Sequence, residues 1–248
     1  MQKSRPSVPQ VLPIALTPTE FHQAVLDLSP KIAVFDCDGT LWSGDAGSAF
    51  MHWSIDTKLF SLDQIAWIKE RYAGYKNSTV SEYDICGDMV TVYRGLPVDR
   101  LRTAAAQFFR DYIEPNIFPE LSTLIAELQH NGCDIWAVSS TNNWVIEEGV
   151  RGFDIPPTRV ISARAQVVGG VITSKLLDVP TGEGKAASLI KAGVATPDAV
   201  FGNSIHDAAM LEIARRAFPV NPTPALLEIA ARHGWPVFYP NGTLPAPA

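Results

Sequence analysis

The chain has 248 residues, of which 46% are hydrophobic, and its formal net charge at pH 7 is −6. This length suits one α/β domain with a sizeable insert or two modest domains, and the hydrophobic fraction is too high for a globally disordered chain. A mildly acidic sequence without a run of like charges gives no reason to expect binding to a nucleic acid or to an anionic membrane.

The first predicted elements lead to a pair of acidic residues. Residues 1–16 are expected to be a loose arm, and the capping-box pattern from Thr17 to Glu20 predicts a short helix after it. The apolar run from Lys31 to Phe35 has the length of a buried strand, and it ends abruptly in the sequence DCDGT from Asp36 to Thr40. Carboxylates directly after a buried strand are costly unless something compensates them, so this turn is the first indication of a site.

Residues 45–114 follow a different pattern, which predicts helices throughout and no convincing strand. A second capping box runs from Ser61 to Gln64, and Pro97 stands where a helix can begin. The block is rich in aromatic residues, and we expect most of them to form the small core of a helical subdomain.

Strands and helices alternate again in the rest of the chain. Asp134 to Ser139 is a second buried strand, and Gly169–Gly170 is a hairpin-turn signal. Ala199 to Phe201 is a third short strand that runs into the polar segment from Gly202 to Asp207. This alternation predicts an α/β fold, in which a Rossmann-like parallel sheet is flanked by helices. The predicted parts are an α/β core of residues 17–44 and 115–248, an inserted helical domain of residues 45–114 and an arm of residues 1–16.

Polar side chains cluster at or near the ends of these predicted strands. The carboxyl ends of parallel strands meet at one edge of a sheet, so residues far apart in the sequence can gather there. Carboxylates with an amide oxygen suit Mg²⁺, and a lysine and a hydroxyl beside them can bind a phosphoryl group. A carboxylate can also be a nucleophile, and a second one a general acid and base. The residues expected to meet are Asp36, Asp38, Ser139, Asn203, Asp207 and, from the start of a helix, Lys185.

The sequence resembles the haloacid dehalogenase superfamily over roughly Ile32 to Val220. The first motif of that family, D-x-D-G-T-[LV], is matched in full from Asp36 to Leu41. The second motif, an apolar strand ending in Ser or Thr, is matched from Ile135 to Ser139, and the third is matched by Lys185. The fourth motif, G-D-x-x-x-D, is matched from Gly202 to Asp207 with one departure.

The resemblance implies a magnesium-dependent phosphatase that works through an aspartyl-phosphate intermediate. It makes Asp36 the nucleophile and Asp38 the general acid and base. It also implies that Ser139 hydrogen-bonds the transferred phosphoryl group, that Lys185 neutralises charge there, and that Thr40 helps to position the two aspartates. The magnesium ligands that it implies are Asp36, Asp38 through its backbone carbonyl, Asn203 and Asp207.

The departure is Asn203, where the family usually has Asp. Asn offers a carbonyl oxygen but no charge, so we expect weaker magnesium binding, with Asp207 moving in to compensate. Two other interpretations stay open, a phosphomutase and a binding protein of this superfamily whose metal site has been weakened. A dehalogenase is disfavoured, because by the same resemblance such enzymes lack the aspartate at the place of Asp38.

The helical insert resembles the cap of the phosphoserine-phosphatase-like branch, which implies a small phosphorylated metabolite as the partner. Asp45 falls where phosphoserine phosphatases carry a Glu that holds the amino group, while Met89 replaces their carboxylate-binding Arg. Phosphoserine, phosphocholine and phosphoethanolamine are therefore candidate substrates. With Trp53, Trp42 could cage a quaternary ammonium, or it could simply pack the hinge of the cap. The residues expected to bind the substrate are Thr40, Trp42, Asp45 and Ser140.

The compartment is predicted from features that the chain lacks. No stretch approaches the ~18 apolar residues that span a bilayer, and prolines interrupt the only apolar patch near the N-terminus. The three cysteines are widely spaced and odd in number, which argues against a disulfide framework and a zinc knuckle. We expect a reduced, cytoplasmic protein that is a monomer or a homodimer.

Overall fold

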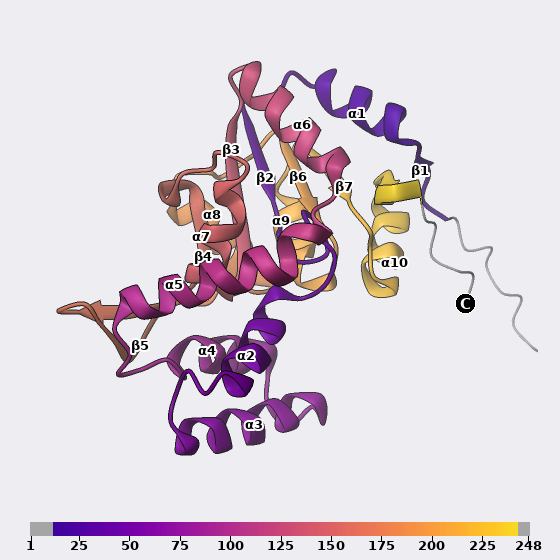
Figure 1. Cartoon of the computed structure of the whole chain (residues 1–248). Coiled ribbons are helices and arrows are strands. Elements are labelled where there is room, and N and C mark those ends of the chain that lie inside the picture. The colour runs from indigo at the N-terminus through magenta and orange to yellow at the C-terminus, as the bar shows by residue number, and fades with distance from the viewer. Residues whose placement is uncertain (1–11, 243–248) are drawn as a thin grey trace, which may run out of the picture.

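The computed structural model of the chain describes residues 12–242 and is built on a six-stranded sheet (Figure 1). The strands have the order β5-β4-β3-β2-β6-β7. All neighbours pair in parallel except β4 and β5, which are antiparallel, so the predicted α/β sheet is confirmed with one antiparallel edge strand. The strands are β2 (Ile32–Phe35), β3 (Asp134–Asn142), β4 (Val160–Val168), β5 (Val171–Asp178), β6 (Ala199–Gly202) and β7 (Arg216–Pro219).

Helices cover both faces of this sheet. Successive residues of β2 point to opposite faces, so Phe35 joins one buried cluster and Val34 the other. Burial on both faces explains why the strands are continuous apolar runs rather than alternating ones. Of the helices outside the insert, those with buried residues in the Phe35 cluster are α1 (Pro18–Leu26), α6 (Pro119–His130) and α7 (Asn143–Arg151). Those in the Val34 cluster are α8 (Glu183–Lys191), α9 (Ala208–Glu212) and α10 (Pro224–His233).

A separate pair of strands, β1 (Ala15–Leu16) and β8 (Val237–Phe238), joins the two ends of the described chain. The pair is parallel, and the backbone N–H of Val237 donates to the carbonyl of Ile14. The prediction of a loose arm is therefore wrong for its last two residues, because β8 offers them backbone partners. Residues 1–11 of that predicted arm lie outside the described part.

Four α-helices, followed by a short π-helix (Phe109–Ile113) and a 3-10 turn (Glu114–Asn116), lie between β2 and α6, and Figure 1 shows α2, α3 and α4 beyond the carboxyl ends of the strands. The side chains of Asp45, Ser61 and Ser81 cap the first three of them, each by accepting a backbone N–H of the first turn. The capping box predicted at Ser61 is confirmed. The helices are α2 (Ala46–Asp56), α3 (Leu62–Lys76), α4 (Glu82–Thr91) and α5 (Val98–Phe108).

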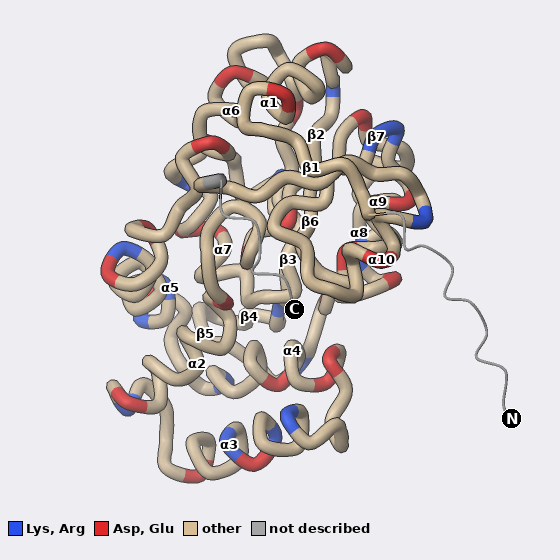
Figure 2. Tube along the Cα trace, turned by 90° about the vertical axis from the view of Figure 1, so that its right-hand side faces the viewer, with Lys and Arg blue, Asp and Glu red and all other residues tan. Residues whose placement is uncertain are grey.

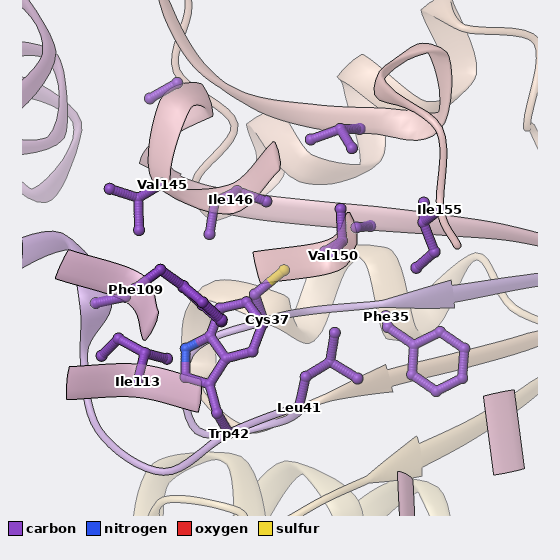
Figure 3. Packing of buried hydrophobic residues seen from close by; sticks show 14 of the residues in the cluster. Phe35, Cys37, Leu41, Trp42, Phe109, Ile113, Val145, Ile146, Val150 and Ile155 are labelled. Atoms are coloured by element: carbon purple, nitrogen blue, oxygen red, sulfur yellow. The ribbon is translucent and has the colours of Figure 1, made fainter. Parts of the chain in front are cut away.

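Two sets of contacts fix this insert to the sheet. The tip of the β4–β5 hairpin binds the segment before α5, since Gly95 N–H donates to Ile172 and Val98 N–H donates to Gly170. The predicted turn at Gly169–Gly170 is confirmed, with both glycines at positive φ. After α5, Phe109 packs edge-on against Trp42 with 5.3 Å between the ring centroids (Figure 3). The insert is thus anchored on both sides of α5.

Charged residues of both signs are interspersed along the chain in Figure 2. Within residues 12–242, no helix combines the length and the apolar composition that crossing a membrane requires.

Candidate active site

The site begins at the carboxyl end of β2, where Asp36 is buried with 4% of its surface exposed. Its Oδ1 accepts a hydrogen bond from Lys185 Nζ at 2.6 Å, and its Oδ2 accepts one from Thr40 Oγ1 at 2.9 Å. The chain then turns through Gly39, which has a φ of +78°. A Cβ at this position would overlap the amide of Asn203, so both the turn and the close approach of Asn203 require glycine.

Lys185 forms a buried ion-pair triad with two carboxylates. Its Nζ lies 2.6 Å from Asp36 Oδ1 and 2.5 Å from Asp207 Oδ1. The other oxygen of Asp207 accepts the backbone N–H groups of Asn203 and Ser204. Asp207 is fully buried and does not line the cavity, so the expectation that it moves in as a metal ligand is wrong. Both of its oxygens are already engaged in holding Lys185 and the turn after β6.

Asp38 is held by three hydrogen-bond donors. Its Oδ1 accepts from Trp42 Nε1 at 2.7 Å and from the backbone N–H of Ala46 at 2.8 Å, and its Oδ2 accepts from Thr141 Oγ1 at 2.7 Å. Thr141 was not singled out in the sequence, although it belongs to the polar run that ends β3. Ala46 is the first residue of α2, so the insert itself orients this carboxylate.

Trp42 is fully buried between Asp38 and the ring of Phe109 and does not line the cavity. The expectation that it binds the substrate or joins a cage with Trp53 is therefore wrong, since Trp53 stacks on Phe50 instead. Thr40 is also buried outside the cavity wall and serves Asp36 rather than a substrate.

The electrostatics of the site are dominated by buried negative charge. Burial, with a further contribution from Asp207, raises the pKa of Asp36 to about 7. Burial and the charge of Asp45 raise the pKa of Asp38 to about 6. Burial alone would lower the pKa of Lys185, but Asp207 and Asp36 more than offset it and raise that pKa, which keeps the ammonium charged. Two carboxylates thus bind the one ammonium, and Asp38 adds a third carboxylate to the site, an excess of acidic groups whose charge a divalent cation would balance.

A cavity of about 210 Å³ opens over these residues, between the sheet edge and the insert. It is smaller than the roughly 300–1,000 Å³ of pockets for drug-sized ligands, which indicates a small ligand. From the core it is lined by Asp36, Asp38, Ser139, Ser140, Thr141, Lys185, Asn203, Ser204 and His206. From the insert it is lined by Asp45, Ser48, Tyr72, Tyr75, Glu82, Ile85, Cys86 and Met89.

The structure therefore brings together most of the predicted site. Of the four residues expected to bind the substrate, Asp45 and Ser140 line the cavity. Ser139 is nearly buried and its Oγ accepts the backbone N–H of Thr141, at a point where the pairing of β3 with β4 becomes irregular. Within residues 12–242, no group of three or more His, Cys, Asp or Glu side chains is arranged to hold a metal ion.

Residues 33–212 match the sequence model of the haloacid dehalogenase-like hydrolases. The chain belongs to this family. As in the sequence prediction, the four motifs of this hydrolase meet at one edge of its sheet, although Asp207 faces Lys185 instead of the cavity.

Two curated relatives and one solved structure extend the comparison. A probable phosphatase of Mycobacterium tuberculosis is 28% identical, covering 89% of this chain and 79% of the relative. A histidinol-phosphatase of Neisseria meningitidis is 26% identical, covering 84% of this chain and 97% of the relative. A phosphoserine phosphatase solved with a phospho-aspartyl intermediate analogue is 14% identical and superposes with a TM-score of 0.57, covering 85% and 93% of the two chains. The hydrolase thus shares the fold of phosphoserine phosphatases.

Proposed function

We propose that this hydrolase is a magnesium-dependent phosphatase that transfers the phosphoryl group of a small monoester to Asp36 and then to water. The observation that carries the proposal is the placement of Asp36 and Asp38 in one small cavity, with Lys185 bound to the first carboxylate. Relatives that are named phosphatases support the same reaction.

In the first step a carboxylate oxygen of Asp36 attacks phosphorus, and the bond from phosphorus to the ester oxygen breaks. Asp38 gives its proton to the departing oxygen, so the leaving group is released as a neutral alcohol. A pKa of about 6 suits this role, because it leaves a protonated fraction of Asp38 near neutral pH. Trp42, Thr141 and the N–H of Ala46 fix the direction of the transfer by holding both oxygens of Asp38.

In the second step Asp38, now a carboxylate, takes a proton from a water molecule that attacks the phosphorus of the aspartyl phosphate. The bond between phosphorus and the Asp36 oxygen breaks, and inorganic phosphate leaves. Ser139 and Lys185 line the cavity where the phosphoryl group would lie, so they would donate hydrogen bonds to its oxygens in both steps.

The donor set fits Mg²⁺, because the cavity carries hard oxygen atoms and an excess of buried negative charge. The Asp36 carboxylate, the Asp38 backbone carbonyl and the Asn203 amide oxygen would hold the ion. When bound, Mg²⁺ neutralises charge on the phosphoryl oxygens. Asp207 would not contact the ion but would position Lys185 through an ion pair and the backbone of Asn203 through a hydrogen bond.

The insert, residues 45–114, would serve as the cap of this enzyme, with the α/β core formed by residues 17–44 and 115–248. It supplies half of the cavity wall, so it would limit the substrate to small phosphorylated metabolites such as phosphoserine, phosphocholine or phosphoethanolamine. A cytoplasmic location is consistent with three buried free thiols, Cys37, Cys86 and Cys133.

The test is release of inorganic phosphate by the purified protein from a panel of phosphorylated metabolites, with Mg²⁺ or with a chelator. We expect multiple turnovers that need Mg²⁺ and are lost in Asp36→Asn. Isomerised ester without free phosphate would indicate a mutase instead. Binding of esters without turnover under any metal condition would indicate a binding protein.

A further inference from the structure

The wall that the insert contributes to the cavity is acidic. Asp45 and Glu82 both line it, and Lys185 is the only Lys or Arg among the described residues of the lining. The ammonium of Lys185 is already bound between Asp36 and Asp207 on the opposite wall. A substrate group that reaches the insert wall therefore meets negative charge without a lysine or arginine to balance it.

Glu82 is held in a fixed position at this wall. Tyr75 Oη donates to Glu82 Oε2 at 2.6 Å, a bond that links α3 to the start of α4, and His206 Nε2 lies 3.6 Å from the same oxygen. The Glu82 side chain keeps 23% of its surface exposed, so the carboxylate is both oriented and accessible. An oriented, partly desolvated carboxylate binds a cation more strongly than one free in water.

Glu82 is not needed to stabilise the N-terminus of α4. The N-terminus of α4 is capped by Ser81, which accepts the N–H of Asp84, and Asp84 is a second acidic residue in the first turn. Glu82 instead faces the cavity, where the rings of Tyr72 and Tyr75 also lie. Lys76 lies over both of these rings, 5.3 Å and 6.0 Å from their centroids, but does not line the cavity.

We propose that Glu82, oriented by Tyr75, binds a positively charged amine of the substrate, so that the preferred substrates are phosphate monoesters of amino alcohols that carry no carboxylate. The thioether of Met89 lines the same wall and offers no charge to a carboxylate. An amino-acid phosphate would leave its carboxylate unpaired beside Asp45 and Glu82, which is costly in a partly buried site. This inference rests on the proposed phosphatase.

The experiment compares kcat/KM for three small esters that differ in charge: phosphoethanolamine, 2-hydroxyethyl phosphate and phosphoserine. The first two are nearly isosteric and differ in the amine. We expect phosphoethanolamine to be favoured over each of the other two by about 10- to 100-fold, the worth of a hydrogen bond to a charged group. Glu82→Gln keeps the acceptor for Tyr75 but removes the charge, so the preference over 2-hydroxyethyl phosphate should fall to near unity.

Glu70→Gln is the matched control, because Glu70 is exposed on α3 and does not line the cavity. It should keep the wild-type preference. Equal kcat/KM for phosphoethanolamine and 2-hydroxyethyl phosphate in the wild type would overturn the inference, as would an equal loss on both esters in Glu82→Gln. Calorimetric binding of the same esters to Asp36→Asn gives the comparison without turnover, so a failed phosphatase and a failed amine site are distinguishable.

Discussion

The two walls of the cavity are built in different ways. The core wall holds Asp36 and Lys185, nearly inaccessible to solvent and bound to each other in an ion-pair triad at the ends of β2 and the start of α8. The insert wall holds Asp45 and Glu82, which are more accessible to solvent. Asp45 is the N-cap of α2, and Glu82 is the first residue of α4. In the first wall, the ion-pair triad and the strand ends hold Asp36 and Lys185, whereas the position of the second wall depends on how the insert docks on the core.

We therefore assign the phosphoryl-transfer reaction to the core wall and the preference among substrates to the insert wall. The core wall holds the proposed nucleophile and proton donor of phosphoryl transfer, whereas the insert wall holds the groups proposed to distinguish one alcohol from another. Substitutions in the core wall should change the rate with every ester, and substitutions in the insert wall should change the ratio between esters.

The strongest test of the core wall is Asp36→Asn. An amide is not a nucleophile here, so kcat should fall by about 10⁴-fold or more for all esters, including those with activated leaving groups. The amide oxygen can still accept the hydrogen bond from Lys185, and the amide NH2 can donate to the hydroxyl of Thr40, so the far-ultraviolet circular dichroism spectrum should be unchanged. A folded variant that retained more than a tenth of the wild-type kcat would exclude this nucleophile.

Asp38→Asn should act on proton transfer alone. We expect a loss of about 10²–10⁴-fold with alkyl phosphates, which need a proton on the leaving oxygen. With p-nitrophenyl phosphate the first step should be nearly normal, because p-nitrophenolate leaves without a proton. A pre-steady-state burst of p-nitrophenolate, followed by slow turnover, is the measurement. Equal slowing of the burst with both kinds of ester would contradict the assigned role.

Thr141→Val probes how the core wall orients Asp38. Loss of the hydroxyl removes one of three donors to that carboxylate and should raise its pKa further above the present value of about 6. If Asp38 acts as an acid, kcat falls at high pH as Asp38 loses its proton. This fall should shift to higher pH in Thr141→Val, and kcat at pH 7 should change by no more than about tenfold. Thr103→Val, on the exposed face of α5, is the matched control and should leave the profile unchanged. An unshifted limb in Thr141→Val would show that the hydrogen bond does not act on Asp38.

Asn203→Asp should increase the affinity of the core wall for Mg²⁺ and leave the insert wall unchanged. A carboxylate in place of the amide adds a charge beside Mg²⁺, so the magnesium concentration for half-maximal activity should fall by about tenfold. The preference among esters should stay the same. An unchanged or higher magnesium requirement would mean that residue 203 does not contact the ion.

The raised pKa values also predict a pH-dependent stability of the metal-free protein. Asp36 and Asp38 bind protons more tightly in the folded state than in the unfolded chain, so the free energy of unfolding should fall as pH rises from about 4 to about 7. The decline should amount to several kcal/mol, and it should be smaller in Asp38→Asn. Urea unfolding with a chelator at pH 5 and pH 8 measures it. A decline of equal size in both proteins would contradict a raised pKa at Asp38.

The sequence predicted the core wall because its signals are local. Apolar runs that stop at DCDGT, at Ser139 and at Gly202 define strand ends, and parallel strands bring their ends together. It did not predict the direction of Asp207, since that depends on Lys185, 22 residues away in sequence, taking one of its oxygens. Nor did it predict the burial of Trp42, which follows from packing against Phe109.

The insert wall was harder to predict for a physical reason. Glu82 sits at the start of a helix, where an acidic residue is favoured for local electrostatic reasons, so its sequence position carries no sign of a cavity. Its place in the cavity wall depends on the hydrogen bonds from Gly95 and Val98 to the β4–β5 hairpin, which hold the insert over the sheet edge. Contacts of such long range leave no local pattern.

The most direct test of the central claim is chemical trapping of the intermediate. The wild-type protein would be mixed with Mg²⁺ and a turned-over ester, quenched, reduced with borohydride and digested for mass spectrometry. We expect homoserine in place of Asp36 in the peptide that contains it, dependent on the ester and on Mg²⁺. Phosphate release with Asp36 unmodified, or with the reduced residue at another position, would contradict the account.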